Sequence, residues 1–79
     1  MNKSLSNYRV EIASDVCDRD GIGLEVYQGK DLVLEIFRDD TENTRKVALF
    51  RNEVDLQLIE EAIKKFKTEV PWEFIDYDK

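Results

Sequence analysis

Three aspartates near the start of this sequence are the residues whose type and spacing come nearest to a metal site. Asp15, Asp18 and Asp20 stand within six positions and offer the hard oxygen ligands that Ca²⁺ and Mg²⁺ prefer. A twelve-residue calcium loop aligned on the glycine that follows would begin at Val16 and end at Tyr27, and neither residue is a ligand. We therefore expect a solvated turn, with a cation site on these aspartates as the alternative.

Few residues of this chain are suited to other kinds of catalytic chemistry. The chain contains no histidine, which excludes histidine-based acid/base pairs, Ser-His and Cys-His nucleophiles and nearly all types of zinc site. Cys17, the single cysteine, forms neither an internal disulfide nor a metal cluster by itself. Glu35 is the one carboxylate with strongly apolar neighbours, but no cleft is predicted around it. We expect no catalytic residue, no cofactor and no enzymatic activity.

The elements that must position these residues are organised around one amphipathic helix, predicted from Asp55 to about Lys67. Its apolar residues recur at spacings of three and four and so share one face. They are Ile59, Ala62, Ile63 and Phe66. Asp55 is placed to cap the first turn with its carboxylate, and Pro71 discourages the preceding residue from continuing as helix. The apolar face requires a sheet to pack on.

Four stretches alternate apolar and polar residues, as strands with one buried face do. They are Tyr8 to Ala13, Leu24 to Gln28, Asp31 to Arg38 and Thr44 to Arg51. The longest segment between them, Ser14 to Gly23, is predicted to be a loop because it is rich in turn-forming residues. This order predicts one α+β domain over residues 1–79: a four-stranded antiparallel meander with a C-terminal helix packed on one face.

The hairpin around Gly29 decides which side chains share a face. Placing the apolar residues of both strands on the helix side requires an odd number of loop residues, so we predict a three-residue loop that includes Gly29. The residues on that side are Leu24, Val26, Leu32, Leu34 and Ile36, and those on the opposite side are Tyr27, Val33 and Phe37. We expect the C-terminal segment to cover the opposite side; the alternative is that it meets a partner.

The last eleven residues are rich in apolar side chains, although loose termini are normally polar. Four of the eight aromatic residues fall in the final fourteen positions. We predict that this segment docks on its own sheet, as a short strand or a turn. The alternative is an interface with a partner or a second copy. The candidate residues for that interface are Trp72, Phe74 and Tyr77, with Tyr27 and Phe37 from the sheet.

Charge and composition limit the kind of partner. The net charge is −6 and the acidic residues are spread along the chain, so the surface repels nucleic acid and attracts a basic protein. No apolar run approaches the ~20 residues that cross a bilayer, so we expect no membrane interaction. The opening residues lack the apolar core of a secretory signal, and we expect a cytoplasmic protein.

These observations favour a small acidic protein-binding module or regulatory subunit over an enzyme. Small acidic antitoxin and immunity proteins, which neutralise basic enzymes, have the same general composition, but the chain carries no motif that names a family. One alternative is self-association as a homodimer, through a strand edge or an exposed apolar sheet face. The other is a Ca²⁺- or Mg²⁺-binding domain built on the loop from Asp15 to Asp20.

Overall fold

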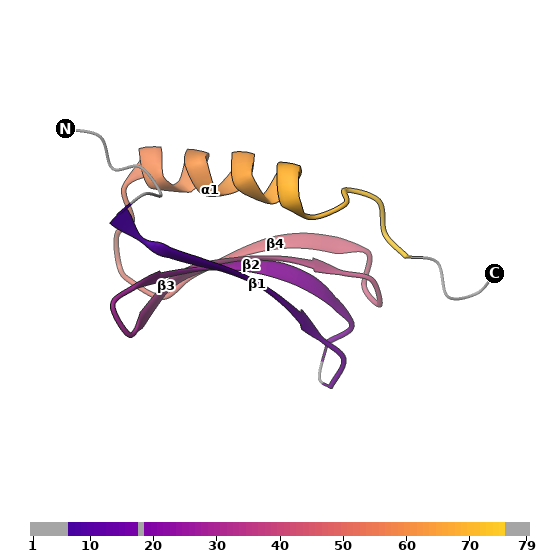
Figure 1. Cartoon of the computed structure of the whole chain (residues 1–79). Helices are drawn as coiled ribbons and strands as arrows, with labels where there is room; N and C mark the ends of the chain where they lie inside the picture. The colour runs from indigo at the N-terminus through magenta and orange to yellow at the C-terminus, as the bar shows by residue number, and fades with distance from the viewer. Residues whose placement is uncertain (1–6, 18, 76–79) are drawn as a thin grey trace.

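The computed structural model describes residues 7–17 and 19–75 as an open antiparallel sheet with a helix on one face (Figure 1). The strands are β1 (Arg9–Asp15), β2 (Gly21–Gln28), β3 (Asp31–Asp39) and β4 (Thr44–Leu49), and they lie in the order β1-β2-β3-β4. The helix α1 (Leu56–Glu69) follows the last strand. The predicted α+β fold, with four strands followed by one helix, is confirmed.

The core lies between α1 and the two central strands. Leu58, Ala62 and Phe66 are buried at intervals of four residues and so form the inner face of the helix. They pack against side chains of β2 and β3, of which Leu24, Val26, Leu34 and Ile36 are buried. The main contacts of α1 are with these two strands. The edge strand β1 contributes the partly buried Val10 to this core, whereas none of the described residues of β4 belongs to it.

The β2–β3 hairpin brings the apolar residues together by a different route from the predicted one. Gln28 pairs with Asp31, so the turn has two residues, and Gly29 adopts a φ of 62° that L-residues rarely take. A β-bulge at Val33 then adds one unpaired residue to β3, which brings Leu34 and Ile36 onto the same face as Leu24 and Val26. The predicted three-residue loop is wrong. The predicted faces of Val33 and Leu32 are also wrong: Val33 is buried in the core, and Leu32 pairs with Tyr27 and so lies on the opposite face.

The loop predicted from Ser14 to Gly23 is shorter than expected, because β2 already begins at Gly21. Gly23 lies within the strand, where a β-carbon would stand 2.7 Å from the carbonyl oxygen of Ile36 and 2.7 Å from Cδ1 of Phe37. The aromatic ring thus occupies the space that a side chain on β2 would fill. Glycine is needed at this position for close packing, and the composition of the segment resembled a loop for that reason.

The ends of α1 are set by the backbone. Asp55 occupies the N-cap position, but its carboxylate accepts no hydrogen bond from the first turn, so the predicted side-chain cap is wrong. At the other end the N–H of Val70 donates to the carbonyl oxygen of Phe66 at 2.9 Å, and Val70 itself is extended. Pro71 follows, and the chain turns from the helix towards the ends of β3 and β4.

Replacing Gly23 with alanine tests the close packing of β2 under Phe37. The added methyl group would crowd a backbone carbonyl and the ring, so we expect the free energy of unfolding, measured by urea denaturation, to fall by roughly 1–3 kcal/mol. Gly29→Asn is the control, because asparagine tolerates a positive φ; we expect it to change stability by less than about 0.5 kcal/mol. An unchanged stability of Gly23→Ala would contradict the close packing.

Candidate functional site

Large apolar side chains lie exposed on the helix side of β4. Val47 and Leu49 point to that side, because they pair with Ile36 and Leu34 of the core. They nevertheless remain 46% and 47% exposed. The reason is the position of α1, whose main contacts are with β2 and β3. The outermost strand is left with half of its apolar surface in water.

The same surface continues along the flank of α1. The Lys67 ammonium lies 5.6 Å from the centre of the Trp72 ring, and that ring stacks at 3.9 Å on the guanidinium of Arg45 in β4. The row of helix residues that includes Lys67 therefore faces β4. The apolar members of this row are Leu56, Ile59 and Ile63. Leu56 is 68% exposed and the two isoleucines are half-buried.

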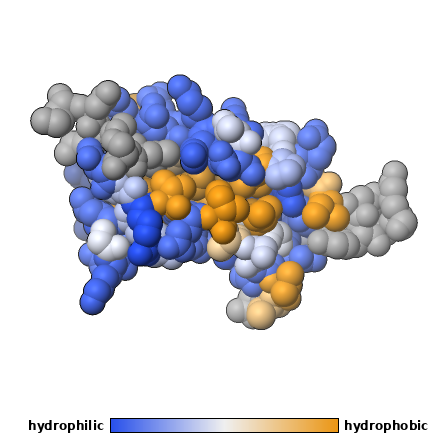
Figure 2. All heavy atoms as spheres, in the orientation of Figure 1, coloured by the Kyte–Doolittle hydropathy of each residue, from blue (hydrophilic) through white to orange (hydrophobic). Residues whose placement is uncertain are grey.

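We name these residues the α1–β4 surface: Val47, Leu49, Leu56, Ile59, Ile63 and Trp72. These apolar residues lie on the sides of α1 and of β4 that face each other, from the start of α1 to the C-terminal segment, where the cations Lys67 and Arg45 pack on Trp72. Figure 2 shows apolar atoms beneath α1 on the β1 side as well. On that edge strand, however, Ile12 is the one large apolar residue with substantial exposure, at 41%.

The C-terminal segment closes one end of the α1–β4 surface. The guanidinium of Arg45 lies between the rings of Trp72 and Phe74, 3.9 Å and 4.1 Å from their centres. Its Nε and Nη2 donate to the carbonyl oxygen of Trp72 at 3.1 Å and 2.8 Å. The segment therefore docks on its own sheet as predicted, and within the described residues it does so without adding a strand. Trp72 stays 45% exposed.

A buried ion pair holds the same segment from β3. The side chains of Arg38 and Asp40 are 4% and 1% exposed; Nη2 donates to Oδ2 at 3.1 Å, and Nε lies 3.0 Å from Oδ1. Nη1 of Arg38 also donates to the carbonyl oxygen of Pro71 at 2.7 Å, and Oδ1 of Asp40 accepts the N–H of Ile75 at 3.1 Å. The pair therefore fixes both ends of segment 71–75.

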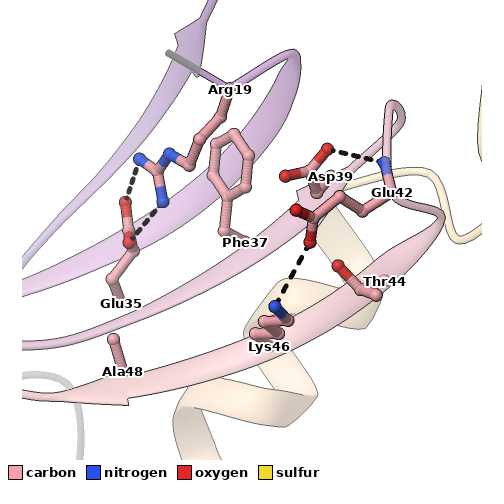
Figure 3. A pocket seen from close by; sticks show the side chains of 8 residues that line it. All are labelled: Arg19, Glu35, Phe37, Asp39, Glu42, Thr44, Lys46 and Ala48. Carbon is pink, nitrogen blue, oxygen red and sulfur yellow. Dashed lines mark hydrogen bonds and ion pairs between the residues drawn. The ribbon is translucent and has the colours of Figure 1, made fainter.

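The opposite face of the sheet carries a second cluster, centred on Arg19 (Figure 3). Its guanidinium donates to both carboxylate oxygens of Glu35 at 3.0 Å and lies 3.7 Å from the centre of the Phe37 ring. The hydrogen bonds to Glu35 raise the pKa of the Arg19 guanidinium. Phe37 is buried beneath it. The predicted cover by the C-terminal segment is therefore wrong, since Arg19 covers this ring and the segment docks on the helix side.

A hollow of about 250 Å³ adjoins this cluster, over the open face of β3 and β4 (Figure 3). The charged groups in its lining are engaged within the chain: Arg19 pairs with Glu35 and the Lys46 ammonium with Glu42 at 3.3 Å, while the carboxylate of Asp39 accepts the backbone N–H groups of Thr41 and Glu42. The hydroxyl of Thr44 is the one buried polar group of the lining with no hydrogen-bond partner in the described chain. Because these groups already interact within the chain, few of them remain to bind a ligand.

The aspartates that the sequence suggested as metal ligands are engaged within the chain or lie outside the described residues. Asp15 accepts the backbone N–H of Cys17 at 3.0 Å and Nε of Arg19 at 3.3 Å; the first of these bonds is the main cause that lowers the pKa of Asp15. The carbonyl oxygen of Asp20 accepts the N–H of Asp40 at 2.7 Å. Asp18 lies outside the described residues. Across residues 7–17 and 19–75 no three acidic or cysteine side chains are arranged to hold a metal ion.

The aromatic residues suggested as partner contacts are not all in one place. Trp72 and Phe74 are brought together by Arg45, whereas Phe37 and Tyr27 lie on the opposite face. The hydroxyl of Tyr27 donates to Glu25 at 2.8 Å, and Arg9 stacks 4.3 Å from the centre of its ring. Tyr77 lies outside the described residues.

Reasoning from the sequence missed most of the α1–β4 surface. The alternation in residues 44–51 places Val47 and Leu49 on one strand face, but it does not reveal whether the helix reaches that face. Arg45 carried no signal, because an arginine in an alternating strand is normally a solvated residue. The signal that the sequence did offer was the width of one helix relative to that of four strands. A single helix is about 10 Å wide and four strands spaced by about 4.8 Å are nearly twice that, so part of the sheet had to stay uncovered.

Asp40→Asn tests the buried pair. Arg38 would keep its charge in a buried position without a counter-charge, so we expect the free energy of unfolding to fall by about 3–5 kcal/mol in urea titrations followed by Trp72 fluorescence. Glu42→Gln, which breaks the exposed pair with Lys46, is the matched control and should cost less than about 0.5 kcal/mol. Equal effects of the two substitutions would contradict the structural importance of the buried pair.

The ionisation of Tyr27 tests its bond to Glu25. Donation to this carboxylate favours the protonated phenol and raises the pKa of Tyr27 above its usual value of about 10. The stability contributed by the bond is therefore fully present below about pH 10 and is lost as the pH rises through the raised pKa. Glu25→Gln should lower the midpoint of the Tyr27 tyrosinate absorbance. Glu11→Gln, a more distant charge, should lower it less, and the reverse order would refute the assignment.

The described helix is too short and too polar to cross a membrane. Across the described residues the structure thus offers exposed apolar side chains between α1 and β4, a further apolar area beneath α1 on the β1 side (Figure 2), and a charged cluster on the opposite face built on the Arg19–Glu35 pair. Comparisons of the chain with protein-family models, with curated proteins and with solved structures find no match.

Proposed function

We propose that this chain is a non-enzymatic protein-binding module that docks its partner on the α1–β4 surface. The proposal is carried by one observation: Val47, Leu49 and Leu56 expose between 46% and 68% of their surface on the facing sides of β4 and α1. A domain of 79 residues needs nearly all of its large apolar residues for a core or an interface. Contiguous apolar surface of this kind typically marks an interaction site.

Trp72 is suited to anchor such an interface. Tryptophan is among the residues that contribute most to binding energy, particularly when its conformation is fixed before the partner arrives. Here the ring is stacked on Arg45 and its carbonyl oxygen accepts two hydrogen bonds from the same guanidinium. Little side-chain freedom remains to be lost on binding. Phe74, on the other side of Arg45, supports this arrangement, so both residues belong to the proposed site.

The net charge of −6 supports a partner that is basic over much of its surface, and we propose the cytoplasm as the place where they meet. Attraction between opposite net charges accelerates association, and the effect weakens as salt screens the charges. The apolar contact itself does not depend on these charges.

A homodimer is the second candidate, and it is favoured by the position of β4 at the edge of the sheet. A strand edge next to an exposed apolar face can pair with its own copy about a two-fold axis. Centring that axis on Val47 would set Lys46 opposite Ala48 of the second copy and so avoid placing two lysines face to face. The oligomeric state in solution separates this candidate from the first.

Capture from a lysate of the source cells tests the proposed function. We compare the wild type with Leu49→Glu, which places a charge on the α1–β4 surface, and with Ile12→Glu, which makes the same change at a similarly exposed residue of β1. We expect one specific partner to be retained by the wild type and by Ile12→Glu. Leu49→Glu should retain about tenfold less, as expected when a charge is buried in an apolar contact.

Circular dichroism and urea titration confirm that each variant is folded before capture. Trp72→Ala should weaken retention in the same direction as Leu49→Glu, because it removes the proposed anchor. Loss of the partner with Ile12→Glu but not with Leu49→Glu would move the site to β1 and contradict the proposal. A dimer in sedimentation experiments, with no other protein captured, would favour the homodimer.

A further inference from the structure

We propose that the partner presents an extended segment that joins the sheet as a fifth strand beside β4, with aliphatic residues towards α1 and acidic residues on the opposite face. This inference rests on the proposed function and specifies the form and chemistry of the partner. It depends on three properties of β4: the direction of its backbone groups, the position of its side chains and its charge.

The outer edge of β4 offers unpaired backbone groups at alternate residues. The N–H of Phe50 donates to the carbonyl oxygen of Val33 at 2.9 Å, which fixes the phase of the hydrogen bonds between β3 and β4. Because these bonds alternate in an antiparallel pair, Arg45, Val47 and Leu49 direct their N–H and C=O groups away from β3. Within residues 7–17 and 19–75 no backbone hydrogen bond reaches these groups. They can therefore form a ladder with an added strand.

The apolar side chains are placed to meet every second residue of that strand. Val47 and Leu49 expose their side chains on the helix side, on the residues whose backbone groups point outwards. A fifth strand would lie about 4.8 Å beyond β4, along the open flank of α1. Its alternate side chains would then contact β4 and the helix row that begins at Leu56. One extended segment can thus form hydrogen bonds with the outward backbone groups of β4 and cover the apolar side chains at the same time.

The charge of β4 selects acidic residues on the other side of the added strand. Thr44–Leu49 contains no acid, although the whole chain carries a charge of −6; of its two cations Arg45 lies on the helix side between Trp72 and Phe74, which leaves Lys46 on the open face. Lys46 projects on the open face, where its side chain is 69% exposed; its partner Glu42, 3.3 Å away in the turn before β4, is exposed as well, so this surface pair is weak and can be exchanged for an acid on the added strand. Opposite charges on directly facing residues of neighbouring strands stabilise a sheet. At contact distances, well within the Debye length of about 8–10 Å, this local charge outweighs the net charge.

The same charges disfavour the other occupants of this edge. A second copy paired through β4 about an axis at Val47 would set Lys46 opposite Ala48 and Arg45 opposite Leu49, so neither cation would gain an acidic partner on the added strand. A helix laid on the surface would cover the apolar side chains but leave the outward backbone groups without ladder partners. An acidic extended segment meets all three requirements.

Selection of peptides from a random displayed library against the full chain tests the inference. We expect the enriched peptides to alternate aliphatic and acidic residues. In their presence the amides of Arg45, Val47 and Leu49 should exchange with solvent at least about tenfold more slowly, because each gains a backbone hydrogen bond. The amide of Ile12, which points away from β2 at the opposite edge, is the internal control and should be unaffected.

Val47→Pro provides a second test, since it removes an outward N–H donor without removing a bond to β3. We expect the selected peptides to bind it about tenfold more weakly. Ile12→Pro, the same change on the outward side of β1, should bind them unchanged. The exchange measurement on the wild type decides the question if Val47→Pro fails to fold.

The outcomes separate this inference from the proposed function. Peptides whose binding is lost with Leu49→Glu but which leave the β4 amides unprotected would refute the fifth strand and keep the binding module. Enriched peptides with basic residues, or protection of the β4 amides by self-association without peptide, would also overturn the inference. Failure to enrich any peptide, or peptides indifferent to both Leu49→Glu and Val47→Pro, would overturn the proposal that this surface binds an extended segment.

Discussion

The rest of the structure depends on a mismatch of widths between one helix and four strands. α1 lies over β2 and β3, and these contacts build the core from residues such as Leu34 and Phe66. A helix about 10 Å wide cannot also cover both edge strands, which extend the sheet by about 4.8 Å on each side. Val47 and Leu49 occupy the same alternating strand positions as core residues do, but their side chains remain about half exposed. The proposed docking surface is a direct consequence of this geometry.

Arginine side chains extend the structure where the apolar core ends. Arg38, paired with Asp40, and Arg45, stacked between two aromatic rings, hold the segment that follows the helix; Arg19 covers Phe37 on the opposite face. A planar guanidinium can stack on a ring and donate several hydrogen bonds at once, which a lysine cannot do. A buried ion pair contributes little net stability, because its desolvation offsets the attraction, but it fixes a single arrangement of the chain. Here it fixes the position of Trp72.

The two faces of the sheet therefore have different roles. On the open face the charged residues are matched within the chain, Arg19 with Glu35 and Arg9 with Glu11. On the helix side the β4 edge keeps apolar side chains and outward backbone groups with no counterpart in the described chain. The negative charge of the whole protein acts at long range, whereas the positive charge of β4 acts on contact. The net negative charge can therefore attract a partner from a distance, and the positive charge of β4 can select which of its segments binds.

The sequence by itself determined the fold class, because alternation over four stretches and the spacing of Ile59, Ala62 and Phe66 depend only on local periodicity. It also predicted that the aromatic C-terminal segment docks rather than remaining free. Tertiary structure decided what depends on distance between elements: the bulge at Val33, the ring of Phe37 over Gly23, and the assembly of Arg45 with Trp72, twenty-seven positions apart. It also decided which apolar faces stay uncovered. Periodicity assigns a side chain to a face, but only the packed structure shows whether another element covers that face.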